Sequence, residues 1–222
     1  MATKALIFDS SSIITLALNN LLYILEPLKK KFGGEFYITE DIKKELIDNS
    51  MQIKRFMLEA LTIKKLIDDG VLKIVSSKEI AKEAERLENI ANYTYKTQEE
   101  WIRIIHEGEA SCLALYSMIK ADKKALVIDE RTTRMLVEAP DNLRKLFEKK
   151  LHTKISSKPE NYSFFKGFNI IRSSELALIA YSAKIISLPT KPKEAIAALL
   201  YAQKYKGCAI SWQEIDLAKT MV

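Results

Sequence analysis

Two aspartates in this chain stand where a parallel sheet would hold a ligand. Asp9 and Asp129 each follow directly after a short apolar run, at 5–8 and at 125–128. Runs of this length suit buried parallel strands, and ligands bind at the carboxyl ends of such strands, where the winding direction switches. Each aspartate could equally cap the helix that follows it, so neither residue alone indicates a site.

Two glutamates lie beside the predicted apolar faces of helices. Glu45 comes three residues after Ile42, and Glu109 precedes Cys112 by three. Residues three apart share a helix face, and an acid beside a buried stripe must be neutral, paired or metal-bound. A surface acid paired with a neighbouring lysine explains Glu45 equally well. Glu107 faces a weaker apolar stripe and ranks below Glu109 as a site residue.

Together these acids predict a cation site. Converging carboxylates are stable near neutral pH only with cations or bound protons. Mg²⁺ and Mn²⁺ take oxygen ligands and keep several waters, which leaves room for phosphate oxygens and an attacking water. His106 lies three residues before Glu109, but no second histidine stands at metal-ligand spacing, so a position at the helix terminus is favoured for it.

The strands that would position these acids are short and alternate with helical stretches. Alternation of this kind predicts an α/β fold, a parallel sheet flanked by helices. Prolines after Leu188 begin a further helical segment, so the expected division is a domain at 1–188 and a C-terminal helical extension at 189–222. The predicted strands are 5–8, 35–39, 71–75, 125–128 and 168–171.

Local signals predict several helix boundaries. Thr39 is expected to begin one helix, and Gly70 to end another before a strand. The pattern Ser/Thr-x-x-Glu is typical of a capping box at a helix start. It occurs in three pairs, Ser76 with Glu79, Thr97 with Glu100, and Ser211 with Glu214.

Composition limits the class of protein. The 222 residues are 48% hydrophobic and 29% charged, as in a globular chain, and the net charge of +6 permits an anionic partner. Cys112 and Cys208 are too few for a disulfide framework or a four-sulfur zinc site, so we expect buried thiols in a cytoplasmic protein. No apolar run suits an export signal or a membrane span.

Several other site types lack their sequence pattern. Neither G-x-x-x-x-G-K-[ST] nor G-x-G-x-x-G occurs, which disfavours a nucleotide-binding loop. The serines after Asp9 lack the glycines of a hydrolase G-x-S-x-G turn. Asp9 is also followed by Ser10 and Ser11, so the second aspartate of phosphoaspartate hydrolases is missing.

Four motifs, in their order along the chain, resemble those of the PIN-domain nucleases. They are ALIFDSSSII, ITEDIKKELID, GEASCLALY and ALVIDERTTR, within a resemblance that covers roughly residues 4–190. The resemblance implies a sheet whose first and fourth motif strands are adjacent, with their acids facing across the switch point. It also implies a metal-dependent endoribonuclease that leaves a 5′-phosphate and a 3′-hydroxyl.

The resemblance carries roles onto particular residues. Asp9 would bridge two cations, Mg²⁺ or Mn²⁺, of the kind that hold the attacking and leaving oxygens of a displacement. Ser11 matches a small polar position lining the metal pocket, and Glu130 matches a further acid found in many members. The implied catalytic metal ligands are Asp9, Glu45, Glu109 and Asp129.

Two long segments depart from the family pattern. The segment 51–105 predicts extra helix that could serve as a clamp or a dimer arm. The segment 142–166 carries seven basic and two acidic residues, which favours contact with RNA. The alternative is that its lysines form a solvated helix face without a binding role. Its aromatic residues could stack bases or belong to the core. They are Tyr162, Phe164 and Phe165, and the RNA-contact candidates are Arg131, Lys149, Lys150 and Lys154.

Two interpretations remain open from the sequence. Arg134 is expected to form a helix ion pair with Glu130 rather than to contact phosphate. The alternative function is an inactive PIN-like module that binds RNA or protein. RNA is the expected partner, an antitoxin-like or RNA-processing protein is left open, and no membrane is expected. Apolar residues of the extension, Trp212, Ile215 and Leu217, are compatible with a homodimer.

Overall fold

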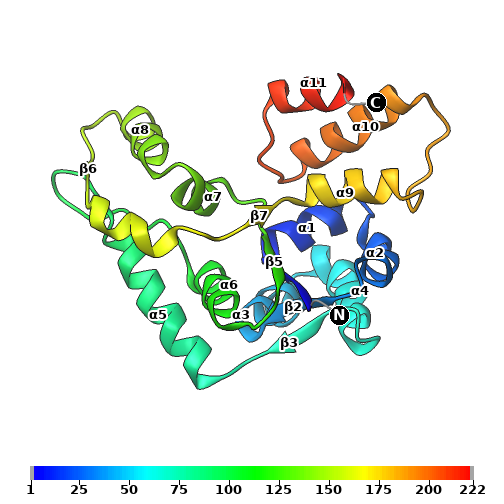
Figure 1. Cartoon of the computed structure of the whole chain (residues 1–222), viewed down its shortest axis with the longest axis horizontal. Coiled ribbons are helices and arrows are strands. Elements are labelled where there is room, and N and C mark those ends of the chain that lie inside the picture. The colour runs from blue at the N-terminus through cyan, green and yellow to red at the C-terminus, as the bar shows by residue number, and fades with distance from the viewer. Residues whose placement is uncertain (1–2, 221–222) are drawn as a thin grey trace.

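A five-stranded parallel sheet forms the centre of the computed structural model, which describes residues 3–220 (Figure 1). The strand order is β3-β2-β1-β5-β7, so the chain leaves β1 in one direction and later returns to its other side. The winding therefore switches between β1 and β5, as the resemblance implied. The strands are β1 Lys4–Phe8, β2 Glu35–Thr39, β3 Lys73–Val75, β5 Lys123–Val127 and β7 Ile170–Ile171.

The strand register brings the two aspartate positions side by side. Phe8 pairs with Val127, the last residue of β5, and the Asp9 amide donates to the Val127 carbonyl at 3.0 Å. Both runs are apolar because these strands are covered on both faces. The strand predicted at 71–75 begins only at Lys73 in the structure. Val71 and Leu72 are buried, but they lie in the turn before β3.

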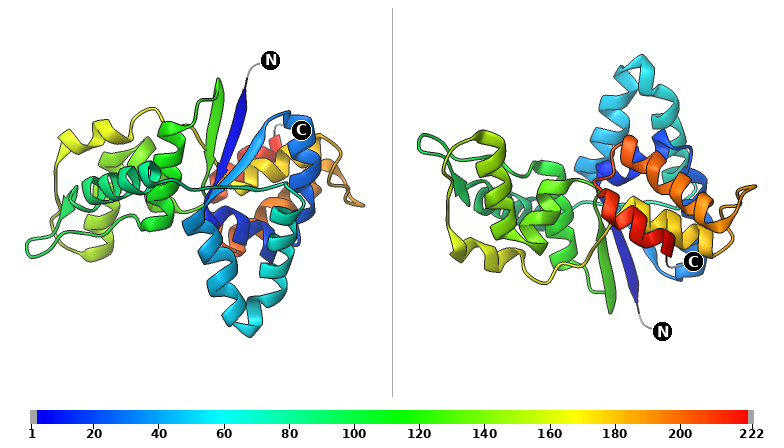
Figure 2. Two further views of the ribbon diagram at one scale, coloured as in Figure 1. Left: turned by 90° about the horizontal axis from the view of Figure 1, so that it is seen from below. Right: turned by 90° about the horizontal axis from the view of Figure 1, so that it is seen from above.

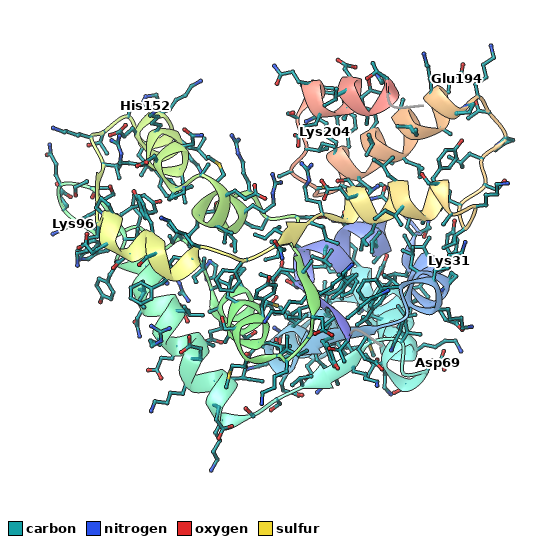
Figure 3. The ribbon with its side chains drawn as sticks, in the orientation of Figure 1. Lys31, Asp69, Lys96, His152, Glu194 and Lys204 are labelled. Atoms are coloured by element: carbon teal, nitrogen blue, oxygen red, sulfur yellow. The ribbon has the colours of Figure 1, made fainter. Side chains whose placement is uncertain are left out.

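Helices cover both faces of the sheet and give three layers. On one face α6 Glu107–Met118 packs against β1, β2 and β5, with α3 Glu40–Lys43 and α5 Lys78–Asn92 beside it (Figure 1). The other face carries α1 Ser10–Leu18, α2 Leu25–Phe32 and α9 Ser173–Ser182. Figure 3 shows side chains packed densely between the sheet and these helices. The predicted α/β class is confirmed.

Beyond the layers the chain forms two projections. The π-helical segment η2 Lys44–Asn49 continues α3 and, with α4 Met57–Asp68, projects from the sheet (Figure 2). On the other side α7 Arg131–Glu138 and α8 Pro140–Leu151 lead to a small antiparallel pair, β4 Tyr95–Lys96 with β6 Ser156–Ser157. Short turns of 3-10 helix are η1 Leu22–Ile24, η3 Ser50–Gln52, η4 Lys54–Phe56 and η5 Pro159–Phe165.

Two helices follow the sheet domain. They are α10 Pro192–Tyr205 and α11 Trp212–Thr220, which pack on each other and on α9 (Figure 1). Trp212 and Leu217 are exposed, but Ile215 is fully buried, so it belongs to a core and does not add to the exposed apolar surface that the sequence suggested. This second core consists of Ile196, Leu200, Cys208, Ile210 and Ile215.

Some predicted helix boundaries are confirmed and others are wrong. Thr39 caps α3, and Gly70 ends α4 with a φ of 70°. Ser211 and Glu214 form the reciprocal capping box, with bonds of 2.7 and 3.2 Å. Ser77, not Ser76, caps α5, because its hydroxyl accepts the Ile80 amide.

The third predicted capping box does not begin a helix. The Thr97 hydroxyl accepts the amides of Glu99 and Glu100, but the chain then runs on to Trp101, which bridges back to Lys96. Threonine makes the same side-chain-to-backbone bonds in turns as in helix caps. The pattern is therefore satisfied by a turn.

The two long segments take different structures. Most of the acidic stretch in 51–105 forms α5, which lies along α6, so it is part of a layer (Figure 1). In the basic segment, Tyr162 and Phe165 are buried core residues, so for these two the core alternative is correct and base stacking is not. Phe164 is exposed, and the Arg86 guanidinium lies 5.4 Å from its ring centre.

Taken singly, each helix of residues 3–220 is too short or too polar to span a bilayer. The pair Ser10–Leu18 and Leu22–Phe32 reaches the length and composition only together, and it is bent by 113°.

Candidate active site

Asp9 lies at the centre of the candidate site. Its side chain is buried, with 2% exposure, and it caps α1 by accepting the Ser11 amide at 3.0 Å and the Ser11 hydroxyl. The Ser11 oxygen in turn accepts the Asp129 amide at 3.1 Å. The capping alternative is therefore correct for Asp9, and it is compatible with a site, because Ser11 ties the two strand ends together. For Asp129 it is wrong, because Glu130 caps the helix that follows.

Glu45 and Glu109 reach the same region from different helices. A Cβ atom added to Gly108 would lie 2.8 Å from Glu45 Oε1, so the missing side chain lets this carboxylate rest against the start of α6. Glu109 is one residue further on, and its Oε2 accepts the His106 amide at 2.8 Å. His106 is thus the residue that precedes α6, as predicted.

The carboxylates act on one another electrostatically. Burial raises the pKa of Asp9 to about 7, and the charges of Glu109 and Glu45 add to the rise against the bonds from Ser11. Burial also raises the pKa of Glu109, and Glu130 adds to it. The charges of Glu45 and Glu109 therefore act on Asp9, and the charge of Glu130 acts on Glu109.

The charge of His106 lowers the pKa of Glu109, but the acids have no ion-pair partner among the described residues. Within residues 3–220, none of Asp9, Glu45, Glu109, Asp129 and Glu130 forms an ion pair with a basic side chain. The surface-acid alternative for Glu45, a pair with a neighbouring lysine, is therefore wrong. Lys43 instead pairs with Glu40 at 3.1 Å and with Asp48 at 3.2 Å.

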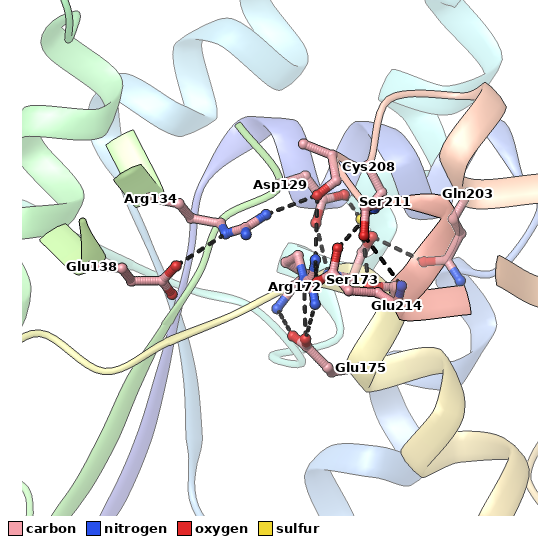
Figure 4. Close-up of polar contacts among 12 residues, drawn as sticks. Asp129, Arg134, Glu138, Arg172, Ser173, Glu175, Gln203, Cys208, Ser211 and Glu214 are labelled. Carbon is pink, nitrogen blue, oxygen red and sulfur yellow. Dashed lines mark hydrogen bonds and ion pairs between the residues drawn. The ribbon is translucent and has the colours of Figure 1, made fainter. Parts of the chain in front are cut away.

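Asp129 is held from a different direction. It is fully buried, and its Oδ1 accepts the Ser173 amide at 2.7 Å while its Oδ2 accepts the Ser173 hydroxyl at 2.5 Å (Figure 4). Gln203 lies behind this hydroxyl at 2.9 Å. The Asp129 carboxylate thus faces the start of α9 and the helix α10.

As they stand, the acids are not gathered around one point. Within residues 3–220 no group of three or more His, Cys, Asp or Glu side chains is arranged to hold a metal ion. Glu109 bonds His106, Asp129 bonds Ser173, and the like charges repel. The donor chemistry still fits a hard divalent cation, because the donors are carboxylate oxygens whose charge the protein leaves unbalanced.

Glu130 and the arginines after it have structural partners. The Glu130 carboxylate caps α7 by accepting the Thr133 amide at 2.7 Å. The ion pair between Arg134 and Glu130 that the sequence predicted is therefore wrong. The Arg134 Nε lies 3.9 Å from Glu138, and its Nη1 donates to the Ala209 carbonyl at 2.9 Å. Arg131 is exposed at the start of α7, directly after Glu130 in the sequence.

The predicted lysine contacts lie apart from the acids. Lys149, Lys150 and Lys154 are exposed at the end of α8 and in the chain that follows. Figure 3 labels His152, which follows α8 and lies among these lysines. It is farther from the strand ends than α7 is. The structure does not bring these lysines to the carboxylates.

Sequence reasoning missed three residues of the site. Gly108 begins the motif GEASCLALY, and its role was not predicted. A glycine beside an acid at a helix start can indicate that another side chain approaches the backbone closely. Ser173 lies two residues after the predicted strand 168–171, at a strand-to-helix turn where serine is a common capping residue. Gln203 gave no signal, because a single glutamine in a helix has no expected partner.

The geometry agrees with a comparison against known families. A family model described as a PIN domain matches residues 5–141, more than half of the chain, from β1 to the start of α8. No curated protein matches the chain. The match includes all four predicted acids and the switch between β1 and β5, and it confirms the resemblance. The chain belongs to the PIN-domain family.

Proposed function

We propose that this protein is a divalent-metal-dependent endoribonuclease. One observation carries the proposal: Asp9 is buried at the switch point, the charges of Glu109 and Glu45 act on it, and within residues 3–220 none of the three forms an ion pair with a lysine or arginine. Burying like charges in this way is costly unless a cation neutralises them. A fold of the nuclease type supplies the context.

Each proposed ligand has a residue that sets its position. Ser11 holds Asp9, the open space at Gly108 admits Glu45, and Ser173 holds Asp129. Together with Glu109, these acids would hold Mg²⁺ or Mn²⁺, and Glu130 is the additional candidate. A bound cation would supply a water of lowered pKa and would offset charge on the leaving oxygen of the RNA.

The basic residues suit an RNA substrate. The net charge is +6, and Arg131, exposed directly after Glu130, would contact a phosphate of the bound strand. Lys149, Lys150 and Lys154 would contact a strand that continues along α8. Both cysteines are buried free thiols, which agrees with action in a reducing cytoplasm.

A second function is favoured by one observation. The carboxylates of Glu109 and Asp129 already accept hydrogen bonds from His106 and Ser173. A protein that kept these bonds permanently would bind RNA without cutting it. Such binding would depend steeply on salt and would be insensitive to a chelator.

Cleavage of a labelled single-stranded RNA tests the proposal. The assay compares Mg²⁺, Mn²⁺ and EDTA for the wild type, Asp9→Asn and Glu45→Gln. Asparagine caps helices as well as aspartate does, so Asp9→Asn removes the charge and keeps the cap. Glu40→Gln, an exposed acid on the helix that leads to Glu45, is the matched control.

The outcomes separate the two functions. We expect cleavage by the wild type and by Glu40→Gln, and its loss with EDTA and with either site variant. Cleavage that survives both Asp9→Asn and EDTA would place the chemistry elsewhere. A wild type that binds several RNAs and cuts none with either metal would favour the binding module.

A further inference from the structure

The C-terminal helices reach an acid of the candidate site. Asp129 is matched by the PIN-domain model, whereas Ser173 and Gln203 lie beyond the matched residues 5–141. Ser173 donates to both Asp129 oxygens, from its amide to Oδ1 and from its hydroxyl to Oδ2 (Figure 4). This two-point contact fixes the plane of the carboxylate.

Gln203 is an unusual residue for the inner face of a helix. It is fully buried, like its neighbours Leu199 and Leu200, which are apolar. One end of its amide lies 2.9 Å from the Ser173 hydroxyl and the other 3.3 Å from the Leu199 carbonyl. A buried amide needs hydrogen bonds to offset its desolvation, and an apolar side chain would serve packing better.

The single hydroxyl proton of Ser173 limits the hydrogen bonds that join Asp129, Ser173 and Gln203. The Ser173 hydroxyl has one proton, and both Asp129 Oδ2 and Gln203 Oε1 face it. The Asp129 carboxylate accepts this hydrogen bond at 2.5 Å and the Gln203 amide oxygen lies at 2.9 Å, so the two acceptors share one donor. Gln203 Nε2 donates to the Leu199 carbonyl at 3.3 Å, which keeps Oε1 directed at Ser173, so Gln203 reaches Asp129 only through the Ser173 hydroxyl.

A separate set of contacts fixes the distance between the extension and Asp129. The Ala209 amide donates to the Asp129 carbonyl at 3.3 Å. The Ala209 carbonyl accepts from Arg134 Nη1 at 2.9 Å and from Arg172 Nη1 at 3.3 Å. The turn after α10 is therefore held against β5, and it keeps Gln203 in register with Ser173.

We propose that Ser173 and Gln203 are positioning residues for Asp129, so that the C-terminal extension is a working part of the metal site. The proposal rests on the proposed function, since Asp129 must be a ligand for its position to matter. Groups that orient metal ligands from behind are known to set both affinity and activity.

The test is Mn²⁺ binding measured by calorimetry on the full chain. The variants are Ser173→Ala, Gln203→Met and the double variant, because methionine fills the space of glutamine without its amide. Leu200→Met is the matched control, a buried residue of α10 whose change disturbs the second core only. Melting temperatures show which variants fold, and Gln203→Asn replaces Gln203→Met if that variant does not.

We expect weaker Mn²⁺ binding with a defined pattern. Loss of such an orienting group typically costs about 10- to 100-fold in metal affinity, so Ser173→Ala should lie in that range and Gln203→Met near its lower end. Because Gln203 acts through Ser173, it should add nothing in the double variant. Leu200→Met should lower the melting temperature and keep wild-type affinity.

The contrary results are distinct. Wild-type affinity in folded Ser173→Ala and Gln203→Met would overturn the positioning role and leave the nuclease proposal intact. Additive losses in the double variant would overturn the link from Gln203 through Ser173. A wild type that binds no Mn²⁺ would overturn the proposed function itself, and the inference with it.

Discussion

The molecule holds its acids in two opposite ways at two neighbouring places. At the candidate site, Asp9 is buried and Glu109 is half-buried, neither forms an ion pair within residues 3–220, and the pKa of Asp9 rises to about 7. At the joint with the extension, Arg172 pairs with Glu175 at 2.6 Å and with Glu214 at 2.7 Å (Figure 4). Although burial opposes it, bonds from Ser211 and Arg172 lower the pKa of Glu214 to about 2.

The contrast separates binding chemistry from structural support. Carboxylates with partners stabilise the fold as it stands, and they have little left to offer a ligand. Carboxylates without partners weaken the empty fold and gain when a cation arrives. The uncompensated cluster is therefore the part of the chain shaped for a ligand, and the paired cluster is the part that keeps the extension in place.

The largest expected effect is a loss of metal-free stability with rising pH. Because the pKa of Asp9 is raised from 3.8 to about 7, its contribution is fully present below pH 3.8 and is lost as pH rises to about 7. At about 1.36 kcal/mol per pH unit, the loss relative to Asp9→Asn is on the order of 4 kcal/mol. Urea unfolding of both proteins in EDTA at several pH values measures it.

Mn²⁺ supplies the matched control for that measurement. Saturating Mn²⁺ should restore wild-type stability near pH 7 and leave Asp9→Asn unchanged. Parallel pH curves for the two proteins in EDTA would contradict the account of Asp9 as an uncompensated acid.

Catalysis should depend on one cluster and not on the other. Asp9→Asn should lower kcat/KM for RNA by more than about 100-fold, beyond the range typical of an orienting group. Glu175→Gln, from the paired cluster, should stay within about threefold of wild type when folded, because it touches no proposed ligand. Equal losses in the two variants would show that the comparison does not separate function from support.

Removing the shared cation should affect stability instead. Arg172→Met leaves Glu175 and Glu214 without their partner and removes one of the two donors to the Ala209 carbonyl. The arginine side chain is only 12% exposed but the carboxylates face solvent, so we expect a loss of about 2 kcal/mol. Thermal unfolding measures it, and Lys219→Met, whose ion pair with Asp216 is exposed, should lose far less.

The sequence predicted the sheet and the positions of the acids well. Apolar runs ending in Asp9 and Asp129 located two adjacent strands, because burial on both faces of a parallel sheet leaves a plain signal. Thr39 and the pair Ser211–Glu214 were predicted correctly because their partners are three residues away. Local chemistry of this kind is visible in sequence.

Side-chain partners across the fold were not predictable. The contact of Asp129 with Ser173 spans 44 residues, and that of Ser173 with Gln203 spans 30. The pairing of Arg134 was missed because Glu130 turned to cap α7 instead. Several partners compete for each polar group, and only the folded chain decides among them.

The smallest effect concerns acid stability at the joint. Because the pKa of Glu214 is lowered from 4.5 to about 2, its contribution is present above pH 4.5 and is lost as pH falls to about 2. Glutamine at this position keeps the capping box, so Glu214→Gln removes the charge alone. The wild type should exceed Glu214→Gln in melting temperature at pH 6, and the difference should vanish near pH 2. The difference is modest because the Glu214 side chain is 41% exposed. A gap that widens toward low pH would contradict the assignment of opposite signs to the two acid clusters.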